Sequence, residues 1–211
     1  MRGRPGAALH LAARFALALT AGCVSVADPP HRQSFLVQFD GAASGARVAP
    51  RRTEAVYVAP VLVAAPYSGR NLVVRQSDLG FAADPYAEFA ANPVSMWTDA
   101  VRSWLDARQL FERVLPLGSN ADAGLTLETN LLEAVVDRRP GQPPASRVII
   151  RFLLIQNQAP HRVLLDRTFE RSAPVKGAGA EHEVAALSLA FEDSLRGLQD
   201  AVARMPEQAS Q

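Results

Sequence analysis

The segment Val148-Ile-Ile-Arg-Phe-Leu-Leu-Ile155 is apolar at every position except Arg151. A short run of branched and aromatic residues of this kind predicts a central β-strand that is buried on both faces. Two further strand candidates flank it: Leu125–Val136, before the proline-rich loop Arg138–Ser146, and Val163–Arg171, after a short connection. Because both connections are short, the three segments are predicted to form an antiparallel meander.

Two amphipathic helices are predicted, one on each side of this meander in the sequence. The first spans Asn92–Gln109, where Asn92 suits an N-cap and Pro93 suits the first helical position. The second spans Glu181–Arg204, and its apolar residues recur at steps of three and four. They are Val184, Leu187, Phe191, Leu195, Leu198 and Val202. Because each helix has one apolar stripe, the predicted fold class is α+β: a single domain with a mostly antiparallel sheet and both helices packed on one face.

The part of the chain before the first helix is less regular. Three shorter strand candidates precede it: Phe35–Phe39, Glu54–Val63 and Asn71–Arg75. We interpret Asp78–Asn92 as a loop that carries two aromatic residues, Tyr86 and Phe89. Within the first helix, Trp97 and Trp104 share the apolar side. Core packing is the default interpretation of these two residues, and a groove for lipid or for a partner is the alternative.

The N-terminus has the layout of a bacterial secretory signal. Arginines precede the apolar run Phe15–Ala21, which is followed by Gly22-Cys23. This ending resembles the lipobox of bacterial lipoproteins, in which the cysteine is acylated and becomes the first residue of the mature chain. An ordinary cleaved signal with an incidental cysteine is the alternative. The predicted organisation is a lipoprotein signal peptide at 1–22, the acylated Cys23 and a flexible tether at 23–33, a folded domain at 34–205, and a polar tail at 206–211.

Charge and cysteine content narrow the range of partners. The chain has 22 Lys and Arg against 21 Asp and Glu, and this near balance argues against nucleic acid as a partner. Cys23 is the only cysteine, so once it is acylated no thiol remains for a disulfide, for thiolate catalysis or for a metal. The apolar run is also too short to span a bilayer, which needs about 17–25 residues.

The sequence contains no convincing catalytic constellation. Glu181, His182 and Glu183 are adjacent on a predicted helix, where neighbouring side chains point about 100° apart and cannot converge on one ion. Asp166 and Glu170 share one face of a strand beside arginines, which favours a solvated face over acid–base chemistry. We therefore predict no catalytic residues, no metal, no cofactor and no enzymatic activity. A hydrolase with residues gathered from distant loops is the alternative.

Four short motifs, in order along the chain, resemble a known family. They are Val56-Tyr-Val-Ala-Pro60, Tyr67-Ser-Gly-Arg-Asn-Leu-Val-Val-Arg75, Asn92-Pro93 with Trp97 and Leu105, and Leu110-Phe-Glu-Arg-Val114. Together with the lipobox they resemble the ABC-type transport auxiliary lipoproteins of the PqiC type, a component of MCE/ABC lipid-transport systems. The chain departs from the family at Val74, where an aromatic residue is usual.

The resemblance implies a location, partners and a role. The domain would lie in the periplasm, anchored by its lipid to the outer membrane; Val24 rather than Asp after the cysteine favours this membrane under the usual sorting rule. The implied partners are an MCE-family protein and its ABC permease and ATPase, which move phospholipids or other lipids between the membranes. The implied role is non-enzymatic. A structural lipoprotein that assembles another outer-membrane complex is the alternative.

The predicted partner-binding residues are aromatic and arginine side chains that precede the first helix. They are Tyr67, Arg70, Arg75, Phe81, Tyr86 and Phe89. Side chains of these types dominate interface hot spots, and loops held by a rigid sheet often carry binding. The alternative is that Tyr86 and Phe89 cover the core beneath the first helix.

Replacing Cys23 by serine tests the lipid anchor. Without a thiol to acylate, Cys23→Ser should leave the signal peptide uncut, or release a periplasmic protein that no longer sediments with membranes. Intact-mass measurement of the wild-type protein should find an acylated Cys23 as the first residue. An unmodified Cys23, or cleavage at another bond, would contradict the lipoprotein prediction.

Overall fold

The structure is a computed structural model, and it describes residues 31–39, 52–116, 118–119 and 121–206. Cys23 and the predicted signal peptide lie outside these residues. The elements, in chain order, are β1 (Gln33–Phe35), β2 (Arg52–Val58), β3 (Leu62–Val63), the 3-10 helix η3 (Ala65–Tyr67), β4 (Asn71–Arg75), β5 (Phe81–Phe89), α2 (Pro93–Arg108), β6 (Phe111–Leu115), β7 (Leu125–Asp137), β8 (Ala145–Gln156), β9 (Arg162–Pro174) and α3 (Ala180–Ala203).

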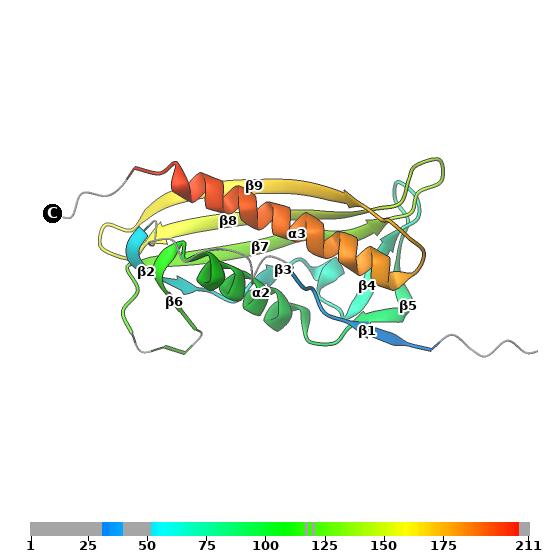
Figure 1. The fold of residues 1–211 in the computed structure, drawn as a ribbon, viewed down its shortest axis with the longest axis horizontal. Helices are drawn as coiled ribbons and strands as arrows, with labels where there is room; N and C mark the ends of the chain where they lie inside the picture. The colour runs from blue at the N-terminus through cyan, green and yellow to red at the C-terminus, as the bar shows by residue number, and fades with distance from the viewer. Residues whose placement is uncertain (1–30, 40–51, 117, 120, 207–211) are drawn as a thin grey trace, which may run out of the picture. The chain divides into compact units, whose positions relative to one another are not determined.

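The C-terminal half confirms the predicted meander. Strand β7 pairs antiparallel with β8, and β8 pairs antiparallel with β9. The pairing follows one register from Leu127 through Leu154 to Leu165, and all three side chains are buried. Both helices pack on the same face of the sheet, with α3 lying across β7, β8 and β9, and α2 contacting β2, β3 and β6 (Figure 1). The predicted α+β fold with two helices on one face is therefore correct.

The N-terminal half adds parallel pairing that the sequence does not predict. Strands β2, β3 and β4 each pair parallel with a successive stretch of β7, at Leu125–Leu127, Asn130–Leu131 and Val136–Asp137 respectively. Strand β6 pairs parallel with β2, β5 pairs antiparallel with β4, and β1 pairs parallel with β5. The sheet is therefore mixed, and β7 joins its two halves.

Strand β8 is buried on one face, and the expectation of burial on both faces is wrong. Its fully buried apolar residues are Val148, Ile150, Phe152 and Leu154. The alternate residues, such as Ile149 and Leu153, are only partly buried. Because both helices cover the same face, neighbouring side chains cover the other face, among them Arg147 in ion pairs with Glu133 (3.4 Å) and Glu170 (2.9 Å).

The segment predicted as the loop Asp78–Asn92 is instead largely the strand β5. Its sequence lacks a clean period of two because Asp84 and Pro85 lie at an irregularity in the pairing with β4. Strand β6 also has no counterpart among the predicted strands, since its exposed residues Glu112 and Arg113 are consecutive rather than alternating. In both segments, pairing with neighbouring strands produces a β-strand although the alternation of apolar and polar residues is weak.

Aromatic side chains fill the space between the two helices. Trp97 and Trp104 are each 1% exposed, which confirms core packing as their role. The rings of Trp97 and Phe191 meet edge to face with their centroids 4.7 Å apart, and they join α2 to α3. The start of α2 also follows the prediction, because the Asn92 side chain accepts a hydrogen bond from the Val94 N–H (2.9 Å) and Pro93 occupies the first turn.

The segment at residues 33–39, here called the N-terminal strap, ties the beginning of the described chain to this core. Pairing covers Gln33–Phe35 rather than the predicted Phe35–Phe39. Beyond β1, Val37 is buried and Phe39 stacks on Phe191 with a centroid separation of 5.5 Å. Among the described residues, no helix is long and apolar enough to cross a membrane.

Truncating the apolar stripe of α3 tests the packing of the helices. Phe191 and Leu195 are fully buried, so Phe191→Ala should cost about 3–5 kcal/mol and Leu195→Ala about 2–5 kcal/mol of unfolding free energy. Leu189→Ala is the matched control on the same helix, because Leu189 is 48% exposed and should cost far less. Urea melts measure all three, and equal losses at Leu189 and Leu195 would contradict the packing.

Candidate partner-binding surface

The β4–β5 hairpin brings two of the predicted site residues together. Arg75 and Phe81 are directly opposed in the register, and the Arg75 guanidinium lies 5.6 Å from the centroid of the Phe81 ring. The same guanidinium donates hydrogen bonds to the carbonyls of Ser77 (3.3 Å) and Asp78 (3.1 Å). Phe81 remains 48% exposed, so the pair presents an exposed aromatic ring that is held in place by a cation–π contact with Arg75.

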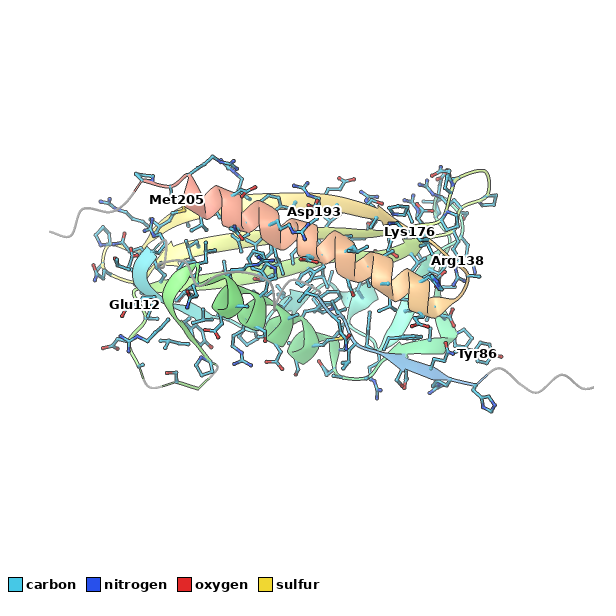
Figure 2. The ribbon with its side chains drawn as sticks, viewed as in Figure 1. Tyr86, Glu112, Arg138, Lys176, Asp193 and Met205 are labelled. Carbon is cyan, nitrogen blue, oxygen red and sulfur yellow. The ribbon has the colours of Figure 1, made fainter. Side chains whose placement is uncertain are left out.

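A bulge in β5 presents Tyr86. The pairing with β4 shifts register between Asn71 and Val73, so several residues of β5 stand opposite one step of β4. The Asp84 carboxylate accepts hydrogen bonds from the N–H groups of Tyr86 (2.9 Å) and Ala87 (3.1 Å), and this holds the bulge in place. Bulges commonly redirect side chains near functional sites. Here Tyr86 is 48% exposed, near the end of the domain at which β1 begins (Figure 2).

Arg70 and Phe89 lie at the other end of the β4–β5 pair. Arg70 donates hydrogen bonds to the Phe89 carbonyl (2.8 Å) and to the Glu88 carboxylate (3.1 Å), while half of its side chain stays exposed. The Phe89 side chain is only 5% exposed and meets Trp97 edge to face at 6.1 Å. Phe89 therefore belongs to the core, as the alternative interpretation proposed, and its ring is not on the surface.

Tyr67 is half-buried in η3, beside β4 and β7. Burial raises the pKa of its hydroxyl, and the negative charge of Glu133 raises it further, while Arg147 and Arg75 act in the opposite direction. Tyr67 is thus held near a mixed set of charges and stays protonated at neutral pH. Among the six predicted partner-binding residues, the more exposed ones are Arg70, Phe81 and Tyr86.

A salt-bridged arginine joins the hairpin to the β7–β8 loop. Arg139 contacts Asp78 in the hairpin turn (2.8 Å) and Asp137 at the end of β7 (2.8 Å). The hydrogen bond from Arg139 lowers the pKa of the Asp137 carboxyl. These residues are absent from the predicted site. The turn sequence Ser77-Asp78-Leu79-Gly80 between two strands is the signal that could have indicated a hairpin here.

Three of the four acidic residues considered for catalysis or metal binding, Glu183, Asp166 and Glu170, are engaged in ion pairs. Glu183 is buried and receives two hydrogen bonds of 2.6 Å from the Arg138 guanidinium. Asp166 receives a hydrogen bond of 2.7 Å from Arg151, which lowers the pKa of that carboxyl and keeps it ionised. Within the described part of the chain, no group of three His, Cys, Asp or Glu residues is placed to hold a metal ion.

A groove of about 440 Å³ lies between the N-terminal strap and α2. Its apolar lining includes Leu36, Val37, Phe39, Met96 and Ala100, and its polar lining includes Ser95 and Asp99. None of the predicted partner-binding residues lines it. Sequence reasoning could not find this groove, because its two walls are separated by more than fifty residues in the chain.

Comparison with known proteins establishes the family. The family model of the ABC-type transport auxiliary lipoprotein component matches residues 38–197, and the chain belongs to this family. No curated protein sequence matches the chain significantly.

Solved structures share the fold at low sequence identity. The crystal structure of protein XCC0632 from Xanthomonas campestris has a TM-score of 0.64 at 16% identity, covering 80% of this chain and 90% of that one. An uncharacterized protein gives a TM-score of 0.62 at 15% identity, with coverages of 82% and 99%. The hypothetical protein CT253 from Chlamydia trachomatis gives 0.50 at 11% identity, with coverages of 72% and 96%.

The ion pairs of Arg139 make a prediction about pH. The folded-state pKa of Asp137 lies below its unfolded value, so its stabilising effect is complete above the unfolded carboxyl pKa of about 3.9 and is lost as the pH falls. Arg139→Gln should therefore lower the thermal midpoint at pH 7 and have little effect near pH 2. Arg113→Gln, at an exposed pair with Glu112, is the control and should change neither midpoint. A deficit in Arg139→Gln that persists at pH 2 would contradict this role.

Proposed function

We propose that this protein is the non-enzymatic auxiliary lipoprotein of an MCE/ABC-type system that moves phospholipids or other lipids between the two membranes. Membership of the ABC-type transport auxiliary lipoprotein family is the observation that carries the proposal. The sequence motifs between Val56 and Val114 point to the same family independently of the fold.

The proposed location is the periplasmic face of the outer membrane. Acylation of Cys23 would supply the anchor, and each buried methylene of an acyl chain contributes about 0.8 kcal/mol of membrane affinity. The identity of Val24, next to the cysteine, supports the outer membrane over the inner one. The domain itself would then work as a tethered binding module.

The proposed absence of catalysis is supported by how the acidic side chains are used. Of the carboxylates that the sequence offered for chemistry, Glu183, Asp166 and Glu170 are each bound by an arginine. The arginine beside Asp166 lowers the pKa of that carboxyl, which makes it poorly suited to general acid–base work at neutral pH, because such work needs a pKa near the working pH. Binding is therefore favoured over hydrolysis.

The proposed partner surface is the outer side of the β4–β5 hairpin with its neighbours. It comprises Tyr67, Arg70, Arg75, Phe81 and Tyr86 and leaves out the buried Phe89. The surface joins two half-exposed aromatic rings to fixed arginines on a rigid pair of strands, which is the composition of interface hot spots. An MCE-family protein is the proposed partner, together with its permease and ATPase.

A pull-down from detergent-solubilised envelopes tests this function. Tagged wild-type protein should recover an MCE-family protein and its ABC components, identified by mass spectrometry. The double variant Phe81→Ala with Tyr86→Ala should recover at least tenfold less, because both rings are 48% exposed and should contribute mainly to binding.

Val163→Ala is the matched control, since Val163 is 58% exposed and lies at the opposite end of the meander, after the β8–β9 connection. It should leave recovery unchanged, and the thermal midpoints of all variants should stay close to that of the wild type. Recovery of another outer-membrane complex instead of an MCE protein would support the structural-lipoprotein alternative and exclude the proposed function.

A further inference from the structure

Leu79 is the most exposed large hydrophobic side chain in the described residues, at 95%. It lies at the apex of the β4–β5 hairpin, in the turn that links Arg75 to Phe81. Single exposed leucines are common and need no explanation by themselves. Leu79 is distinguished by the way in which the turn around it is held.

The turn is fixed by contacts from three directions. The Gln76 N–H donates to the Gly80 carbonyl at 2.8 Å and closes the turn. The Asp78 carboxylate accepts from Arg139 in the neighbouring β7–β8 loop at 2.8 Å, and the Asp78 carbonyl accepts from Arg75 at 3.1 Å. An apolar side chain on a rigid support loses little conformational entropy on binding, which is the property of an interface anchor.

We propose that Leu79 inserts into an apolar pocket of the partner protein, and that a basic side chain at the rim of this pocket faces Asp78. The inference deepens the proposed function and rests on it, because the partner in question is the MCE-family protein. Leu79 is continuous with the proposed partner surface through Phe81, which follows it by two residues and is itself half-exposed. The hairpin thus presents the Leu79 side chain and the Phe81 ring on a single rigid element.

The charge next to Leu79 selects a protein pocket over a lipid surface. The side chain of Asp78 is 84% exposed at the apex and pairs with Arg139 (2.8 Å) and Arg75 (3.8 Å), so a bilayer that received Leu79 would also have to desolvate these ion pairs. Ionised side chains are costly in the hydrocarbon region, and a membrane-binding segment carries an excess of Lys and Arg, whereas the arginines at this turn are paired with Asp78 and Asp137. A protein pocket with a basic rim can accept both side chains, because it buries the leucine and pairs with the carboxylate.

The test replaces Leu79 by serine in the full-length lipoprotein. Leu79→Ser should reduce recovery of the MCE-family protein at least tenfold in the envelope pull-down, with an unchanged thermal midpoint. Leu62→Ser is the matched control: Leu62 is 68% exposed in β3, outside the hairpin, and its replacement should leave recovery unchanged. Arg139→Gln keeps Leu79 but frees the turn, and it should reduce recovery by less than Leu79→Ser.

Photo-crosslinking from the apex identifies the occupant. Leu79 replaced by p-benzoylphenylalanine should form a crosslink to the MCE-family protein in intact cells, whereas the same replacement at Leu62 should not. A crosslink only to a second copy of this chain would overturn the proposal. So would flotation of the purified lipoprotein with phosphatidylethanolamine–phosphatidylglycerol vesicles that becomes weaker in the Leu79→Ser variant, because that outcome would place Leu79 in lipid.

The two proposals fail in different ways. If the wild-type protein recovers the MCE-family protein and Leu79→Ser recovers it equally well, the proposed insertion of Leu79 into a partner pocket is wrong and the proposed function stands. If the wild-type protein recovers no MCE-family protein under conditions that recover other lipoprotein complexes, the proposed function is wrong and the identity of the partner falls with it.

Discussion

Strand β7 makes backbone hydrogen bonds along both of its edges, and this shared pairing fixes the positions of the other strands. One edge accepts the whole of β8. The other edge accepts three short strands in succession, β2, β3 and β4, each running parallel to it. A two- or five-residue strand has little stability alone, so these strands depend on β7 as a common template. The β4–β5 hairpin, and with it the exposed aromatic surface, takes its position from the last two residues of β7.

The helices depend on the sheet and on each other through a small number of rings. Phe191 of α3 contacts Trp97 of α2 on one side and Phe39 of the N-terminal strap on the other. One side chain therefore connects three segments that are far apart in the chain. The resulting core is continuous from the strap to α3, and the half-exposed Phe81 and Tyr86 of the proposed partner surface lie outside it.

The sequence predicts best those elements whose pattern is local. The meander follows from the apolar run at Val148–Ile155, and the start of α2 follows from Asn92 and Pro93, because strand formation and capping depend on a few consecutive residues. The same run does not predict which faces of β8 are buried, since that depends on where the helices pack. Parallel pairing with β7 is invisible in the sequence, since it joins segments that are separated by more than fifty residues. The same limit applies to the site: Tyr86 and Phe89 are three residues apart in one strand, yet only their place relative to the bulge decides that one is exposed and the other buried.

If Cys23 carries the proposed lipid anchor, the N-terminal strap limits how far the domain can lie from the membrane. Between Gln33 and Phe39 the chain pairs with β5 and then places Val37 and Phe39 against the core, so this length is not free to extend. With Cys23 as the proposed lipidated residue, nine residues, Val24 to Arg32, separate it from the strap, and covalent geometry limits any chain to about 3.5 Å per residue. The start of the strap would therefore lie within about 30 Å of the membrane surface. A partner that extends across the periplasm would therefore bind this domain only with the part that comes close to the anchoring membrane.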